Sequence, residues 1–145
     1  MIRTEILEQP LDAERALDAC GRGDNGAIDL FVGQVRNLNE GRAVNAVSYD
    51  LHRSLCEQTF RDICEEAERR FGEQLDYYLA HRHGRIEIGE ASVIAAVGSP
   101  HRDEAFRACR FLVEQMKHRA PIWKQEHYVD GDSEWLPGHA LHQSA

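Results

Sequence analysis

The chain has 145 residues, enough for one domain with a hydrophobic core and too few for two domains of ordinary size. Its 25 acidic and 17 basic side chains give a net charge of −8, which disfavours nonspecific binding to nucleic acid or to anionic membranes. No apolar run is long enough to span a membrane and the first residues lack a secretory pattern, so we expect a single cytoplasmic domain over residues 1–145.

The first third of the chain predicts a short helix and two strands. Residues 11–20 have the apolar spacing of an amphipathic helix, and the glycine-rich stretch 21–26 ends it. Apolar and β-branched residues predict strands over 27–35 and 43–51. The polar residues 36–42 between them predict a loop.

A second helix and two further strands follow. Residues 54–71 carry apolar side chains at intervals of three and four, which predicts a helix that ends at Gly72. Residues 75–86 and 91–99 are predicted strands. The second of these is apolar enough to be covered on both faces of a sheet.

The third predicted helix begins near Ser99 and ends at Arg119. Ser99 is the expected N-cap, Pro100 fits the first helical position, and Pro121 prevents continuation. An extended segment, a turn and a short strand come after it (122–129, 130–133 and 134–136). The order of elements predicts an α+β sandwich in which helices pack against a mixed sheet.

The four cysteines lack the spacing of a zinc site or of a disulfide framework: Cys20, Cys56, Cys64 and Cys109. We expect small buried hydrophobic residues in a reducing compartment, with a reactive thiol as the alternative.

Lys117 is the first candidate functional residue. It lies at the edge of the apolar stripe of the third helix, so its ammonium is expected to be partly desolvated. Burial and neighbouring cations would lower its pKa and make a proton donor or nucleophile available (His118, Arg119 and Lys124). The alternative is that these basic residues only satisfy the carbonyl end of the helix.

His101 and Arg102 occupy the first turn of the same helix, where free N–H groups favour an anion such as phosphate. Alternatively, Arg102 pairs with nearby carboxylates on a solvated face. Arg102 and Lys117 are fifteen residues apart, about 22 Å along a helix axis. They serve separate sites, or a symmetric dimer brings the start of one helix to the end of its partner's.

Two other features are weaker candidates. Arg36 follows a predicted strand into a polar loop, a common position for a ligand-binding side chain. His81 and His83 would share one face of a strand, but the sequence offers no clear third ligand, so we expect no metal site.

Four stretches together resemble the large, catalytic subunit of molybdopterin synthase. They are FVGQVRN (31–37), HRHGRIEIGE (81–90), VGSPHRDEAFRAC (97–109) and MKHRAPIWKQE (116–126). Each stretch alone is weak, whereas their order and spacing are specific. The resemblance spans roughly residues 26–135.

The resemblance implies a sulfurtransferase of molybdenum cofactor biosynthesis. In that family two large subunits form a homodimer, and each binds a small ubiquitin-like subunit whose Gly-Gly tail carries a thiocarboxylate, giving a heterotetramer. The complex adds two sulfurs to cyclic pyranopterin monophosphate and forms the dithiolene of molybdopterin, without a further cofactor. The implied fold is an α/β hammerhead-type core with a mixed sheet, packed helices and an additional β-rich part.

The family's pocket lysines fall on Lys117 and Lys124, which are therefore the expected catalytic residues. The expected substrate-binding residues are Arg36, His101, Arg102 and Arg119. The resemblance implies that the pair at the helix start comes from the opposite subunit, which removes the difficulty of the 22 Å separation. No cysteine is needed as a sulfur carrier, because the partner's tail supplies the sulfur.

The chain departs from the family pattern in its second strand, where Asp50 and His52 replace an expected glutamate and tyrosine. A C-terminal basic residue of the pocket has no match after Trp135. Two other readings remain open: a Schiff-base enzyme that uses Lys117, and a non-catalytic adaptor that binds an anionic tail.

Overall fold

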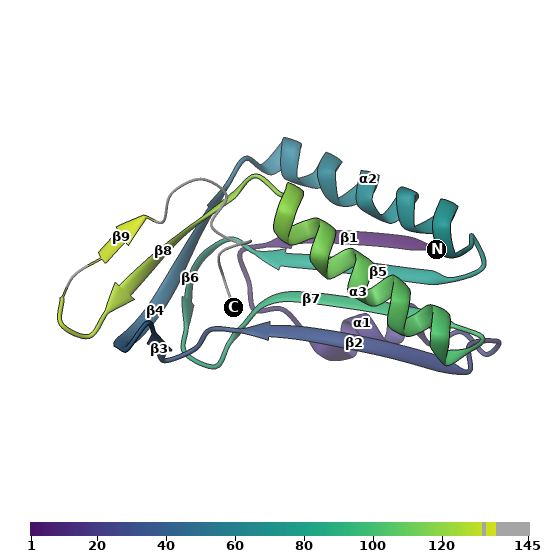
Figure 1. Ribbon diagram of the computed structural model, residues 1–145, viewed down its shortest axis with the longest axis horizontal. Helices are drawn as coiled ribbons and strands as arrows, with labels where there is room; N and C mark the ends of the chain where they lie inside the picture. Colours follow the sequence, from purple (N-terminus) through teal and green to yellow (C-terminus); the bar gives the residue numbers. More distant parts are fainter. Residues whose placement is uncertain (132, 136–145) are drawn as a thin grey trace.

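The computed structural model describes residues 1–131 and 133–135, and this part of the chain forms two β-sheets and three α-helices (Figure 1). The first sheet has the strand order β1-β5-β7-β2, made by Ile2–Leu7, Asp76–Arg82, Ala91–Ser99 and Ala27–Gln34. β1 and β5 are parallel and the other neighbours are antiparallel, so this sheet is mixed.

Helices cover both faces of the first sheet. α2 (Arg53–Phe71) and α3 (Arg102–Arg119) lie on one face, and α1 (Ala13–Cys20) lies on the other (Figure 1). Because side chains alternate along a strand, β5 contributes to two cores. Tyr77 belongs to the larger core under α2 and α3, and Tyr78 belongs to the smaller core beside α1.

The second sheet adjoins the first at the end where α2 begins and α3 ends (Figure 1). Its strands are β3 (Leu38–Asn39), β4 (Arg42–Leu51), β6 (Gly84–Glu87), β8 (Ile122–Tyr128) and β9 (Ser133–Trp135). β4 pairs with β6 along one edge and with β8 along the other, and β8 pairs with β9. The α+β class, the mixed sheet with packed helices and the additional β-rich part are confirmed.

The strands differ from the prediction in three places. Residues 75–86, expected as one strand, form β5 and β6, which belong to different sheets. The chain changes sheet at Gly84, whose φ of 102° is accessible to glycine at little cost. No strand is predicted at the N-terminus, yet β1 pairs in parallel with β5, and β3 lies within the expected loop 36–42. β1 depends on a partner distant in the sequence, whereas β3 is two residues long and pairs with the start of β4 through a tight turn at Glu40 and Gly41, both with positive φ, so local alternation reveals neither strand.

The start of α3 also differs from the prediction. His101, rather than Ser99, is the N-cap, and the helix begins at Arg102. Ser99 ends β7 and is fully buried, and its Oγ accepts a hydrogen bond of 3.3 Å from the N–H of His101. The serine therefore holds the turn before the helix and does not cap the helix itself.

The four cysteines are free and buried, which confirms their expected role as small core residues. Burial raises the pKa of Cys20 to about 11 and that of each of the other three thiols to about 12. None of the helices in residues 1–131 is long and apolar enough to cross a membrane.

Candidate active site

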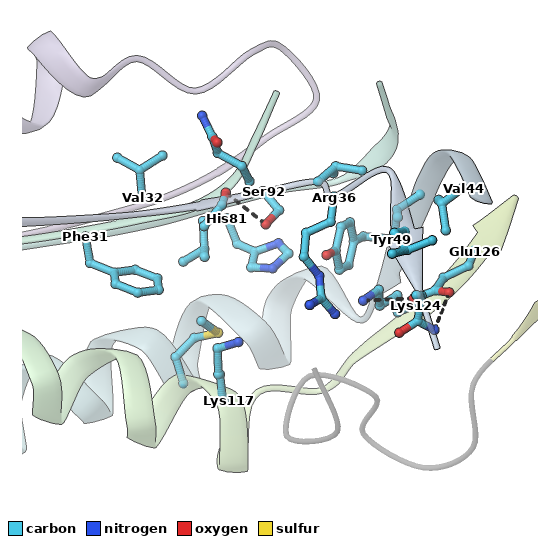
Figure 2. Close-up of a pocket in the computed structure, with 18 residues that line it drawn as sticks. Phe31, Val32, Arg36, Val44, Tyr49, His81, Ser92, Lys117, Lys124 and Glu126 are labelled. Atoms are coloured by element: carbon cyan, nitrogen blue, oxygen red, sulfur yellow. Dashed lines mark hydrogen bonds and ion pairs between the residues drawn. The ribbon is translucent and has the colours of Figure 1, made fainter. Parts of the chain in front are cut away.

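A cavity of about 250 Å³ opens where the end of β2, the last turn of α3 and strands β4 and β8 meet. Pro121 ends α3 and the chain turns directly into β8, which places Lys117 and Lys124 on two sides of this cavity. On a third side, the register of β2 shifts at Gly33 and Gln34, and the strand ends there. Figure 2 shows Arg36, Lys117 and Lys124 reaching toward this space from three segments.

Lys117 and Lys124 are the only two lysines of the 145-residue chain, and both line the cavity. The other fifteen basic residues, histidines aside, are arginines. Lysine carries a compact charge and releases its proton more readily than arginine. Both lysines of the chain therefore lie at one place in the fold.

Lys117 is half-buried in the last turn of α3, next to the fully enclosed Met116. No carboxylate of the described residues forms an ion pair with its ammonium, and Glu114 acts on it only as a more distant charge. Burial lowers the pKa of Lys117, and the positive charges of Lys124 and Arg36 lower it further. The lowered pKa of Lys117 agrees with the prediction from the sequence, and its physical causes are desolvation and repulsion between like charges.

Lys124 has a different environment, because a carboxylate holds it. Its Nζ lies 3.2 Å from Glu126 Oε1, and the two side chains are only 11% and 4% exposed. The second oxygen of Glu126 accepts hydrogen bonds of 2.7 Å from Asn39 and from the hydroxyl of Tyr128. Every oxygen of this buried carboxylate is thus satisfied, and the position of Lys124 is fixed.

Glu126 was not singled out from the sequence, although a signal for it exists. Lys124 and Glu126 are two residues apart on β8, so their side chains emerge on the same face of the strand. Such a spacing is common among exposed ion pairs, and only burial distinguishes this one. Asn39 could not have been linked to Glu126, because it lies 87 residues away in the sequence.

Arg36 lies just beyond β2 and is exposed, and no carboxylate of the described residues pairs with its guanidinium. The cavity therefore combines two cations without a carboxylate partner, Arg36 and Lys117, with one that is neutralised, Lys124. A cationic surface of this kind can bind an anion although the whole chain is acidic.

The other predicted substrate-binding residues lie elsewhere in this chain. His101 and Arg102 are exposed at the far end of α3 and do not line the cavity. Arg119 Nη1 lies 2.6 Å from Glu66 on α2, which ties the two helices together. Their roles toward a substrate stay predictions, and the first two require a second copy of the chain.

The two residues that depart from the family pattern lie outside the cavity lining. His52 is the N-cap of α2, where its side chain accepts a hydrogen bond from the N–H of Leu55. Asp50 is exposed, and its carboxylate lies 3.7 Å from His83. The residues after Trp135, where no basic match was found, lie outside the described part of the chain.

Comparisons with known proteins point to one family. Residues 6–119 match the MoaE protein family. The molybdopterin synthase catalytic subunit of Synechococcus elongatus is 45% identical over 139 residues, which cover 96% of this chain and 84% of that protein. The same subunit of Thermoplasma volcanium is 36% identical over 137 residues, 93% of this chain and 99% of that protein. The crystal structure of molybdopterin synthase from Staphylococcus aureus has a TM-score of 0.86 at 30% identity, covering 92% of this chain and 96% of that one.

Proposed function

This chain belongs to the MoaE family of molybdopterin synthase catalytic subunits, enzymes of molybdenum cofactor biosynthesis, and we propose that it is a sulfurtransferase. The sulfur comes from the thiocarboxylated C-terminus of a small ubiquitin-like subunit, and the acceptor is cyclic pyranopterin monophosphate. The observation that carries this proposal is the cavity in which the only two lysines of the chain and Arg36 meet. Tail and pterin phosphate are both anionic, which suits these cations.

The two lysines have different tasks in this proposal. Lys117 has no carboxylate partner among the described residues, so its full charge is available to the thiocarboxylate and to the charge that develops during transfer. Its lowered pKa also suits it to give up a proton. Lys124 is held by Glu126 and acts as a hydrogen-bond donor of fixed position, while Arg36 binds the pterin phosphate or ring.

The stoichiometry follows from the chemistry of the donor. Each transfer exchanges one sulfur for one oxygen: a carbon–sulfur bond forms on the pterin as a carbon–oxygen bond there breaks, and the acyl carbon of the tail loses its sulfur and gains an oxygen to become an ordinary carboxylate. A dithiolene contains two sulfurs, so two thiocarboxylated tails are consumed for each product. The cavity must therefore release one tail and bind the next.

The proposal includes a symmetric dimer of this chain with one small subunit bound to each copy, in the cytoplasm. It is supported by the position of His101 and Arg102, which lie about 22 Å along α3 from Lys117 and so cannot reach the same cavity. A two-fold axis near the middle of α3 would bring them to the cavity of the other copy. Arg119, whose guanidinium already pairs with Glu66, would contribute to the positive field at the edge of the site.

The test is conversion of cyclic pyranopterin monophosphate by the purified protein with a thiocarboxylated small subunit from the same source. We expect one molybdopterin for every two thiocarboxylates consumed. A small subunit that ends in an ordinary carboxylate is the matched control and should give no product. Absence of product with a carrier that is active beside the Synechococcus elongatus subunit would contradict the proposal and favour a tail-binding adaptor.

A further inference from the structure

His81 is a polar residue in an otherwise apolar position. It lies on the central strand β5, on the same face as Tyr77 and Leu79, and is only 1% exposed. Burying an imidazole costs free energy unless its ring nitrogens find partners. A leucine would satisfy the packing of this strand without that cost, so the ring nitrogens need an explanation.

Two contacts fix the orientation of the His81 ring. Its Nδ1 lies 2.8 Å from the backbone oxygen of Arg82, and a carbonyl oxygen can only accept, so Nδ1 carries the proton and donates. The ring of Tyr49 packs edge-on against it, with centroids 4.9 Å apart and an interplanar angle of 80°. In the neutral ring the other nitrogen, Nε2, is therefore an acceptor in a fixed direction.

This acceptor opens onto the cavity that holds Lys117. His81 lines the cavity, and no described residue donates a hydrogen bond to its Nε2. Nε2 is nevertheless not fully enclosed by the described residues. Because His81 lines the cavity, this nitrogen is accessible from the cavity. Figure 2 shows the ring of His81 in the cavity wall, with Lys117 on the side of α3.

The imidazole is neutral at physiological pH. Burial lowers the pKa of His81 to about 4. The hydrogen bond to the backbone of Arg82 raises this pKa, and the charges of Lys117 and His83 lower it. His81 and Lys117 line the same cavity, so the ammonium and the ring face one space. A neutral acceptor can hold an ammonium without cancelling its charge, whereas Glu126 neutralises Lys124.

We propose that His81 is a positioning residue for Lys117, whose ammonium donates a hydrogen bond to a water molecule that in turn donates to Nε2. The contact holds Lys117 at the place where charge develops and leaves its positive charge undiminished. The geometric part of this inference is independent of the reaction, and its catalytic consequence rests on the proposed sulfur transfer. The charged or titratable groups around Lys117 come from five segments: Glu114 on α3, Arg36 after β2, Tyr49 on β4, His81 on β5 and Lys124 with Glu126 on β8. β7 contributes only Ser92 and Val93.

The pKa of Lys117 can be measured directly, because the whole chain has only two lysines. Lysine labelled with ¹³C at Cε gives two NMR signals, and the Lys124→Arg variant assigns them. His81→Asn keeps a donor near Nδ1 and removes the acceptor, so the ammonium loses a partner and the pKa of Lys117 falls by about one unit. His81→Gln places an amide near Nε2 and restores at least about half of that shift.

Tyr77→Phe is the matched control, because it removes the hydrogen bonds of the Tyr77 hydroxyl to the backbone oxygens of Gly72 (2.8 Å) and Ala67 (3.3 Å), on the same face of the same strand and away from the cavity. It should leave the pKa of Lys117 unchanged. An unchanged pKa in His81→Asn, or an equal shift in Tyr77→Phe, overturns the proposal. In the conversion assay, His81→Asn lowers kcat and moves the alkaline limb of its pH profile with Lys117, which a merely structural role would not do.

A measurement on the unmodified protein covers the case in which His81→Asn does not fold. The ¹⁵N signal of His81 Nε2 should have the shift of an unprotonated nitrogen and should move at the pH where Lys117 titrates. A signal that stays constant through the Lys117 titration overturns the proposal. Because neither NMR experiment needs activity, their outcome is separate from the failure of the proposed function.

Discussion

The ion pair between Lys124 and Glu126 should be the strongest polar coupling of the cavity. Their atoms are 3.2 Å apart and both side chains are almost fully buried. At an effective dielectric constant of about 20 the gross attraction is about 5 kcal/mol, and the cost of removing both charges from water offsets more than half of it. We therefore expect a net coupling free energy of about 2 kcal/mol.

A double-mutant cycle measures this coupling. In Glu126→Gln the NH₂ group of the new amide faces either Lys124 or the donors Asn39 and Tyr128. One hydrogen bond is therefore lost, and the free energy of unfolding falls by about 2–3 kcal/mol. Lys124→Met leaves a buried carboxylate and costs about as much, and the double variant costs about 2 kcal/mol less than the sum. Free energies of unfolding come from urea titrations followed by tryptophan fluorescence. A coupling below roughly 0.5 kcal/mol would refute the reasoning.

Three further predictions concern stability and reactivity. Lys117→Met should be at least as stable as the unmodified protein in urea titrations at pH 7, because burial disfavours the ammonium. The lowered pKa makes Lys117 neutral in the folded chain at higher pH, so the difference in the free energy of unfolding should shrink as the pH rises through that pKa toward 10.5. A difference that grows with pH would contradict the lowered pKa. A thiol reagent at pH 8 should label essentially no cysteine in the native protein and four in urea, and rapid native labelling would disprove their burial. Gly98→Ala should lower the free energy of unfolding by about 1–3 kcal/mol, because the added carbon meets the backbone oxygen of Cys20, whereas Gly23→Ala, with open space around it, should change little; equal effects would contradict the packing.

Most helices and strands were predictable, because their apolar patterns are local. The helix over 54–71 is observed as Arg53–Phe71, and the helix predicted to end at Arg119 does so. The misplaced features depend on distant partners or on single backbone angles. β1 forms because β5 offers an edge, and the division between β5 and β6 depends on the positive φ of Gly84.

The same distinction holds for the candidate site. Lys117 was recognisable because helical spacing places it at the edge of a buried stripe. The partners that give each lysine its properties were not, since Glu126 depends on burial and Asn39 on a hairpin far away in the sequence. The sequence indicates His81 only as a possible metal ligand, because its position at the cavity depends on how β5 and α3 pack together.

The central claim is that Lys117 acts in the transfer itself and not only in binding the tail. The most direct measurement is the single-turnover rate of sulfur transfer by Lys117→Ala, together with its Kd for the small subunit and with Arg61→Ala, on the outer face of α2, as the control. We predict a rate at least roughly 100-fold lower with a Kd within about threefold of the unmodified protein. A rate that recovers once the small subunit is saturating would show that Lys117 serves docking alone and would contradict the account.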